Sequence, residues 1–272
     1  MPLTAKHDGV EIYFRTEGTG PPLLLISGTG HDHQFWSGQL PTFREQFRTL
    51  VFDNRGVGKS SVPEPGYSLA DMAGDAVRVL DSASVDKAHV MGFSMGGHIA
   101  QELAINYPDR VSSLGVHHSW CRNSARLRTF QETRLELARQ DQRLALAEFS
   151  MLGLHSHDYY NAHADEMRAH RDFLLDQSPM NVGWIGQLEA CLTGDTCDRL
   201  DRIDVPTLVT CSTLDVIAAP HHSRAIADQI PGATLVEIPD TGHVALMERP
   251  QQFADLCLGF LRPHVDRPRS RD

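Results

Sequence analysis

Short apolar runs alternate with helical segments along the first part of the chain, and this order most constrains the fold. Leu23–Ile26 and Thr49–Asp53 are too short for helices and are apolar nearly throughout, which is typical of strands buried on both faces. Ser68-Leu-Ala-Asp71 matches the capping box that opens a helix, and the next strand is expected at Ala88-His-Val-Met91. The alternation predicts an α/β protein with a mostly parallel sheet and helices on both faces.

A long stretch in the middle of the chain breaks this alternation. Between Ser119 and Asp204 strand signals vanish and helical periodicity dominates. The apolar side chains expected to face inward there are Leu127, Phe130, Leu135, Leu144 and Phe149. Because alternation resumes afterwards, the helical stretch is interpreted as an insertion over the carboxyl edge of the sheet, where such folds bind ligands. The expected division is a core over 1–118 and 205–262, a helical cap over 119–204 and a flexible tail over 263–272.

Composition narrows the class of protein. A chain of 272 residues can bury a core without disulfides or metals, and 41% apolar residues exclude a disordered protein. Because 35 acidic residues outnumber 25 basic ones, giving a net charge of −10, we expect no nucleic-acid partner. No apolar run is long enough for a membrane span, and the N-terminus lacks the apolar region of a secretory signal. We therefore expect a cytoplasmic monomer or homodimer without membrane contact.

Neither the cysteines nor the histidines form a complete ligand pattern. The 5 cysteines are scattered without a Cys-x-x-Cys motif, so we expect reduced, mostly buried thiols. Among 15 histidines, the stretch His155–His163 superficially resembles a hydrolase metal motif. Its third histidine is displaced, however, and no second ligand set completes a coordination shell. We expect neither a metal nor a cofactor.

The motif that carries chemistry is Gly92-Phe-Ser-Met-Gly96-Gly97, which follows an expected strand and opens an expected helix. A turn this tight needs glycines on both sides of the serine and holds the serine backbone under strain. The Ser94 hydroxyl then projects above the sheet, beside the N-terminus of a helix that favours developing negative charge. This context predicts that Ser94 is a nucleophile rather than an ordinary turn residue.

A serine hydroxyl needs a base oriented by a carboxylate, and in this architecture the chain order is serine, acid, histidine. Asp215 and His243 follow the expected strands at 207–211 and 234–238, so all three side chains should meet at one edge of the sheet. Asp240 and Asp204 compete for the acid role. Asp240 is better suited to supporting its own turn, and Asp204 precedes a strand rather than following one, so Asp215 is preferred.

Acyl transfer also needs two N–H donors for an oxyanion. The first expected donor is the backbone of Met95. The second is expected in the loop Ser27-Gly-Thr-Gly30, with Thr29 as donor, because glycines there let the backbone approach closely.

These motifs together resemble the α/β-hydrolase superfamily over nearly the whole chain. Asp53-Asn-Arg-Gly-Val-Gly-Lys-Ser60 matches its D-x-R-G-x-G-x-S turn, and Ile203-Asp-Val-Pro206 and Gly242-His243 match the surroundings of its acid and histidine. One departure is Ser27-Gly28, where many members have His-Gly, so a role for that histidine does not transfer. Size and cap length are most similar to the cluster of 3-oxoadipate enol-lactonases, aminoacrylate hydrolases and small carboxylesterases. Haloalkane dehalogenases and epoxide hydrolases carry aspartate at the elbow, which Ser94 argues against.

The resemblance implies a serine hydrolase that cleaves a small ester or lactone. Alternatives on the same triad are C–C or C–N bond hydrolysis and perhydrolysis, and a third possibility is a hydrolase-fold ligand receptor with slow turnover. The pocket candidates are aromatic or histidine side chains: Phe35, Trp36, Phe93, His118, Trp120, Phe149, Tyr159, Tyr160 and Trp184. Arg122, Arg126 and Arg128 could recognise a carboxylate, although an exposed charged helix face is the simpler interpretation.

Overall fold

A mostly parallel sheet of seven strands forms the centre of the computed structural model, which describes residues 3–4, 7–176 and 180–265. The strand order is β1-β3-β2-β4-β5-β6-β7, and β1 alone pairs antiparallel with its neighbour among these strands. The strands are β1 (Phe14–Glu17), β2 (Pro22–Ile26), β3 (Arg48–Phe52), β4 (Ala88–Phe93), β5 (Val111–His117), β6 (Thr207–Ser212) and β7 (Thr234–Ile238). The α/β-hydrolase fold expected from the sequence is thereby confirmed.

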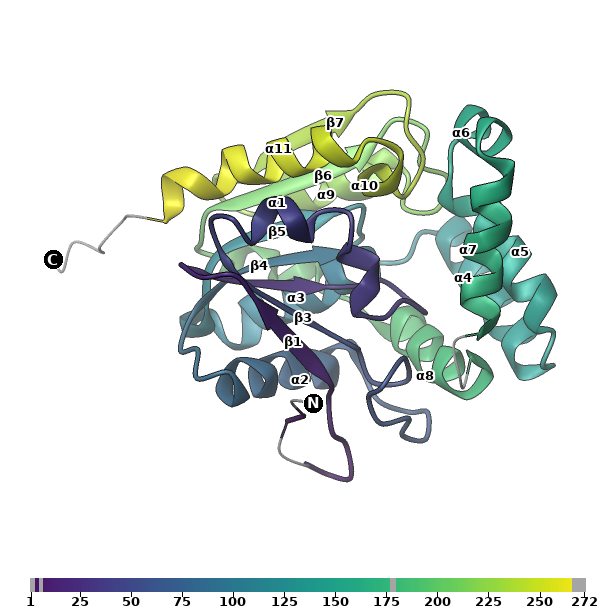
Figure 1. Ribbon diagram of the computed structural model, residues 1–272, viewed down its shortest axis with the longest axis horizontal. Coiled ribbons are helices and arrows are strands. Elements are labelled where there is room, and N and C mark those ends of the chain that lie inside the picture. The colour runs from purple at the N-terminus through teal and green to yellow at the C-terminus, as the bar shows by residue number, and fades with distance from the viewer. Residues whose placement is uncertain (1–2, 5–6, 177–179, 266–272) are drawn as a thin grey trace, which may run out of the picture.

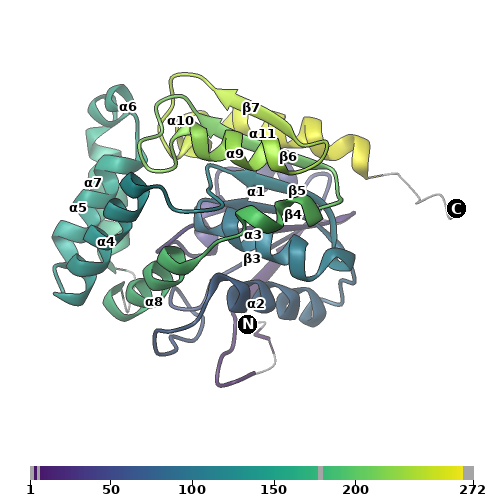
Figure 2. The same ribbon diagram turned by 180° about the vertical axis from the view of Figure 1, so that it is seen from behind.

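Helices cover both faces of the sheet, as Figures 1 and 2 show from opposite sides. One face carries α1 (Leu40–Phe43), α10 (Ala245–Glu248) and α11 (Pro250–Leu261). The other face carries α2 (Leu69–Ser82), α3 (Met95–Asn106) and α9 (Pro220–Gln229). The predicted capping box forms, because Ser68 Oγ accepts from the Asp71 N–H at 3.1 Å and an Asp71 oxygen accepts from the Ser68 N–H at 2.8 Å.

Between β5 and β6 the described chain is helical, and these helices stand beside the carboxyl ends of the strands (Figure 1). We call them the helical segment: α4 (Ala125–Arg139), α5 (Arg143–Leu154), α6 (His157–Ala162), α7 (Ala164–Asp176), α8 (Met180–Thr193) and a 3-10 helix over Cys197–Arg202. Leu144 was expected to face inward, but it lies on the outer face of α5 and is 52% exposed. That expectation was wrong because α5 contacts its neighbours through Leu146, Ala147 and Met151 instead.

The cysteines differ from the sequence-based expectation of five reduced thiols. Cys121 and Cys197 form a disulfide that joins the two ends of the helical segment, across 76 positions of sequence. Cys191, Cys211 and Cys257 are free and buried. Disulfides are typical of oxidising compartments, so this bond does not support the expected cytoplasmic location. That location stays a prediction.

Short elements lie near both ends of the described chain. Regular pairing of the first strand begins only at Phe14, while Val10 and Tyr13 form isolated bridges. The expected tail begins within a 3-10 turn over Arg262–His264, and residues 266–272 lie outside the described ones. Within the described residues, no helix is long and apolar enough to cross a bilayer.

Candidate active site

Steric constraints shape the turn between β4 and α3. Ser94 has φ 55° and ψ −117°, a strained conformation for a residue with a side chain. A Cβ atom on Gly92 would collide with the Gly96 carbonyl, and one on Gly96 would collide with the Ile26 carbonyl on β2. The strained turn holds the Ser94 side chain in one place. Ser94 is half-buried and lines the pocket, so its hydroxyl can be reached from there.

The three residues expected to form a triad are brought together by loops after three different strands. His243 Nε2 lies 2.9 Å from Ser94 Oγ, and His243 Nδ1 lies 2.7 Å from Asp215 Oδ2. Asp215 Oδ1 accepts from the N–H groups of Ile217 and Ala218 at 2.8 and 2.9 Å, which fixes the carboxylate. With an acid, an imidazole and a hydroxyl in hydrogen-bonded series, the imidazole can take a proton from the serine while the carboxylate stabilises its cation.

The electrostatics of Asp215 favour its charged form. Burial alone would raise the pKa of this carboxyl, but the His243 imidazole, through its charge and hydrogen bond, and the Ile217 N–H hold the pKa below its usual range. Asp215 therefore stays ionised at neutral pH although it is only 4% exposed.

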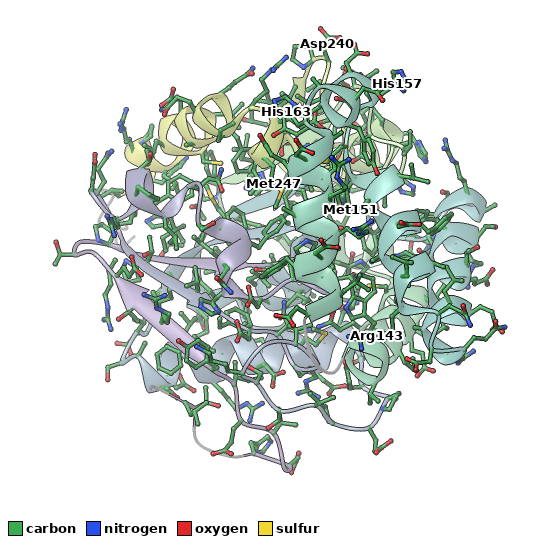
Figure 3. The ribbon with its side chains drawn as sticks, turned by 45° about the vertical axis from the view of Figure 1, so that its right-hand side comes forward. Arg143, Met151, His157, His163, Asp240 and Met247 are labelled. Atoms are coloured by element: carbon green, nitrogen blue, oxygen red, sulfur yellow. A yellow bond between two sulfur atoms is a disulfide. The ribbon has the colours of Figure 1, made fainter. Side chains whose placement is uncertain are left out.

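The competing acids lie elsewhere. Asp240 is exposed at the outer end of the molecule, close to the end of the helical segment that carries His157 (Figure 3). Its N–H donates to Thr213 Oγ1 at 2.9 Å, and its φ of 54° marks a turn residue. Asp204 is exposed at the opposite, amino-terminal end of β6.

The loop expected to donate to an oxyanion lies against Ser94. A Cβ on Gly28 would lie 3.2 Å from the Ser94 Cβ, so the loop backbone and the hydroxyl share one corner of the pocket. Thr29 lines this pocket, and the Met95 N–H opens α3, where an N–H has no acceptor within its own helix.

Helix α8 holds the same loop from the other side. The side chain of Gln187, fully buried, accepts from the Gly30 N–H at 2.8 Å and donates to the Arg55 carbonyl at 2.9 Å. The Trp184 ring packs so closely on Gly30 that no side chain would fit there, and Gly30 has a positive φ of 78°.

A second support holds the loop that carries His243. The Glu248 carboxylate, 6% exposed, accepts from the Ser156 N–H and hydroxyl, both at 2.7 Å, and from the Gly242 N–H at 3.2 Å. The Val244 N–H also donates to the Leu154 carbonyl at 3.0 Å. The end of α5 and the His243 loop are therefore one hydrogen-bonded unit, which sequence reasoning did not predict.

A pocket between the sheet edge and the helical segment opens onto Ser94 and His243. It is narrow, with about 20 Å³ at its centre, roughly the space of one water molecule. Four of the aromatic residues expected to line a pocket do line it: Phe35, Phe93, Trp120 and Trp184.

Five of the expected pocket residues are not part of this lining, so their assignment to the pocket is corrected. Trp36 is fully buried against Phe253, and Phe149 stacks on Phe130 within the helical segment. Tyr159 stacks on His155 and His163, and Tyr160 lines a separate surface groove. Their positions depend on how helices pack on one another, which helical spacing alone does not determine.

His118 is the fifth of these residues, and it lies behind the triad. Its ring is fully buried, stacks on Phe93 at 5.2 Å and meets the His243 ring edge-on at 6.0 Å. Its Nε2 lies 2.8 Å from Ser212 Oγ. Burial lowers the pKa of His118 to about 3, so the ring is neutral and supports the triad from the protein interior.

Sequence reasoning missed the polar side chains that line the pocket from α4. Gln131 and Arg134 are 1% and 8% exposed, and they share the inward stripe of α4 with Leu127 and Ala138. A signal was present, because positions 127, 131, 134 and 138 follow the helical repeat and two of them are polar. By contrast, Arg122 is 51% exposed and pairs with aspartates at the surface.

One group of possible metal ligands lies outside the pocket. In the described part of the chain, Asp32, His33 and Asp53 place ligand atoms within 4.8 Å of one another. Their own hydrogen bonds occupy these atoms: Asp53 accepts from the His33 N–H and ring and from the Lys59 N–H, and Asp32 accepts from Gln34. The group shapes the turn after β3. In the His155–His163 stretch, His157 and His163 lie toward the Asp240 end of the molecule (Figure 3).

A strained serine turn on a mostly parallel sheet, facing a histidine and an aspartate from later loops, is the architecture of the α/β hydrolases. The sequence profile of the alpha/beta hydrolase fold matches residues 21–250, so the chain belongs to this family.

Particular relatives are similar over almost their full length. The chain is 29% identical over 260 residues to a protein of Azorhizobium caulinodans named "Putative carbamate hydrolase RutD", covering 96% of this chain and 98% of that one. The enol-lactonase of Burkholderia xenovorans LB400 has a TM-score of 0.88 at 27% identity, covering 96% of this chain and 100% of that one. A thermophilic esterase of Thermogutta terrifontis has a TM-score of 0.86 at 29% identity, covering 97% of both chains.

Proposed function

We propose that this chain is a serine hydrolase that cleaves small carboxylic esters or lactones through an acyl-enzyme on Ser94. The observation that carries the proposal is the hydrogen-bonded series from Ser94 Oγ to His243 Nε2, at 2.9 Å, and from His243 Nδ1 to Asp215, at 2.7 Å. Similarity to an enol-lactonase and an esterase supports the substrate class.

In the first half-reaction, His243 Nε2 takes the hydroxyl proton as Ser94 Oγ attacks the carbonyl carbon. The carbonyl oxygen becomes an oxyanion within reach of the Thr29 and Met95 N–H groups. The tetrahedral intermediate collapses, the bond to the leaving oxygen breaks, and that oxygen receives the proton from His243. Asp215 keeps the imidazole in the tautomer with Nε2 free and stabilises its cation.

In the second half-reaction, water replaces the leaving group. As the water oxygen attacks the Ser94 ester, His243 takes a proton from that water. The same N–H donors stabilise the second oxyanion. When this intermediate collapses, His243 returns the proton to Ser94 Oγ and the carboxylic acid leaves. The cycle consumes one water and needs no electron donor or acceptor.

Hydrolysis of a C–N bond is a second candidate, because the Azorhizobium relative is named for carbamate hydrolysis. The same residues would act on a carbamate. The difference lies in the leaving nitrogen, which His243 must protonate before the C–N bond breaks.

Turnover of p-nitrophenyl acetate by the wild type, by Ser94→Ala and by Ser37→Ala tests the proposal. Ser37 is exposed and outside the pocket, so its variant controls for the loss of any one serine hydroxyl. We expect an acyl-enzyme burst and turnover in the wild type and in Ser37→Ala, and a loss of at least about 10³-fold in Ser94→Ala. A fluorophosphonate probe should add to Ser94 alone.

Matched esters, lactones and carbamates would then rank the bond types by kcat/KM. A wild-type protein with neither burst nor labelling would contradict the hydrolase proposal and favour a ligand receptor on this fold.

A further inference from the structure

Arg134 is a buried cation in the wall of the same pocket as Ser94. Its Nε donates to Ser150 Oγ at 3.1 Å, and its guanidinium carbon lies 4.9 Å from the centre of the Trp184 ring and 5.5 Å from that of Phe130. These contacts fix the plane of the guanidinium, while its two terminal nitrogens have no hydrogen bond to the described residues. A planar fork of N–H donors is thus held in place before any ligand binds.

Among the described residues, no carboxylate pairs with this cation. The described residues that interact favourably with Arg134 are Ser150, Phe130, Trp184 and the Cys191 thiol, and none of these is a carboxylate. Burial raises the pKa of Cys191 to about 11, so this thiol is neutral at pH 7. Other arginines of the chain are paired: Arg55 with Asp75, and Arg199 with Glu102. A buried charge without a partner is strongly unfavourable, so its retention here needs a reason. Burial lowers the pKa of Arg134 to about 10, which still leaves it protonated at neutral pH.

The rest of the pocket also favours an anion. Among the described residues that line it, none is aspartate or glutamate, so no fixed negative charge would repel a carboxylate. The lining indoles of Trp120 and Trp184 each have a buried N–H without an acceptor. His31 does not compete as a cation, because burial and the neighbouring His170 lower its pKa to about 3.

We propose that Arg134 binds a free carboxylate carried by the substrate, so that the preferred substrates are half-esters of dicarboxylic acids or lactones with a carboxylate. This inference rests on the proposed hydrolase function and names its substrate class. A carboxylate matches the two parallel N–H donors of one guanidinium. The net charge of −10 repels anions at long range, which favours a single carboxylate over a polyanion.

The kinetic test compares p-nitrophenyl hemiglutarate with its neutral analogue p-nitrophenyl valerate. The readout is the ratio of the two kcat/KM values in the wild type, Arg134→Gln, Arg134→Lys and Arg122→Gln. Arg122→Gln is the matched control, because it removes the same charge from an exposed arginine that pairs with Asp195 and Asp198.

We expect the acid-to-neutral ratio to fall by about 10²- to 10³-fold in Arg134→Gln, because a buried carboxylate loses its partner. It should fall by about tenfold in Arg134→Lys, which keeps the charge but not the planar fork, and should change less than about twofold in Arg122→Gln. The Lys variant preserves the test if the Gln variant does not fold. Equal ratios in Arg134→Gln and Arg122→Gln would overturn the proposal.

A binding measurement separates this inference from the proposed hydrolase function. Calorimetric titration of glutarate, with glutaramide as the neutral comparator, needs no turnover and uses the Ser94→Ala background. We expect glutarate to bind at least about 100-fold more tightly to Ser94→Ala than to Ser94→Ala/Arg134→Gln, even if no ester is hydrolysed. Equal affinity of the two variants for glutarate, or no binding to either, would reject the carboxylate site while leaving any esterase activity intact.

Discussion

Glu248 holds the loop that carries His243, and its removal should affect stability and catalysis together. Its carboxylate accepts three hydrogen bonds, two of them from the backbone N–H groups of Ser156 and Gly242. Glu248→Ala leaves both buried N–H groups without an acceptor, at about 1–3 kcal/mol each, so the free energy of unfolding should fall by about 2–6 kcal/mol. Glu248→Gln keeps an acceptor oxygen for both and should cost only about 1–2 kcal/mol.

Catalysis should follow the same order. Gly242 precedes His243, and a displacement of the imidazole by about 1 Å is enough to lower kcat by about 10²-fold. We therefore expect kcat for p-nitrophenyl acetate to fall by about one to two orders of magnitude in Glu248→Ala and by less than about fivefold in Glu248→Gln.

Urea denaturation followed by circular dichroism, together with burst kinetics on the same samples, measures both effects. Glu148→Ala is the control, since Glu148 is exposed and pairs loosely with Arg171 at 3.5 Å. If Glu248→Ala unfolds at the wild-type urea midpoint, or keeps the wild-type kcat, the carboxylate does not hold the loop and the reasoning fails.

Three further perturbations have defined outcomes. Gly96→Ala should lower activity by at least about 10²-fold and the free energy of unfolding by about 1–3 kcal/mol, because the added Cβ would collide with the Ile26 carbonyl. The control is Gly259→Ala, which has open space around the added Cβ and should be neutral or stabilising in thermal melts. Reducing the Cys121–Cys197 bond, or replacing both cysteines by serine, should lower the free energy of unfolding in urea titrations by about 4.5 kcal/mol, the chain-entropy value for a separation of 76 residues. An unchanged urea midpoint with reductant would contradict this prediction. Burial lowers the pKa of His117 to about 3 in the folded protein, so between about pH 6.5 and 3 this histidine binds a proton in the unfolded chain but not in the folded one. Its contribution to stability is therefore complete above about pH 6.5. Below that pH, the free energy of unfolding falls by about 1.4 kcal/mol per pH unit until about pH 3. His117→Gln should therefore flatten the pH dependence of the urea midpoint between pH 6 and 4, and an unchanged slope would argue against this assignment.

The parts of the fold that the sequence predicts are those that local chemistry determines. Leu23–Ile26 is apolar on both faces and Ala88–Met91 is apolar except for His89, and each lies within a strand of the sheet interior. The turn at Ser94 is predictable because only glycine avoids the collisions at positions 92 and 96. The six residues from Gly92 to Gly97 are therefore enough to identify this turn. The Ser68–Asp71 cap is equally local.

The parts that sequence reasoning misplaced depend on contacts between distant segments. Nothing in the local sequence distinguishes Trp36 from Trp184 as a pocket residue, yet Trp36 packs in the core and Trp184 lines the pocket. The reason is that the neighbours of each tryptophan come from elements distant in the sequence. The partner of Cys121 is 76 positions away, and no spacing rule identifies it. Arg134 was detectable only as a polar position on an apolar stripe, a pattern that the more conspicuous arginines at the start of α4 obscured.

The contact between α8 and the Gly30 loop limits how this protein could be redesigned. Exchanging the whole helical segment for that of a relative is an obvious way to transplant specificity onto the α/β scaffold. Such a graft would remove Gln187, which accepts from the Gly30 N–H, and Trp184, whose ring the glycine accommodates. A chimera that keeps α8 and residues 154–156 from this chain, and exchanges only α6 and α7, would preserve those contacts as well as the hydrogen bonds of Leu154 and Ser156 to the His243 loop. The boundary for a productive graft therefore lies before α8 rather than after it.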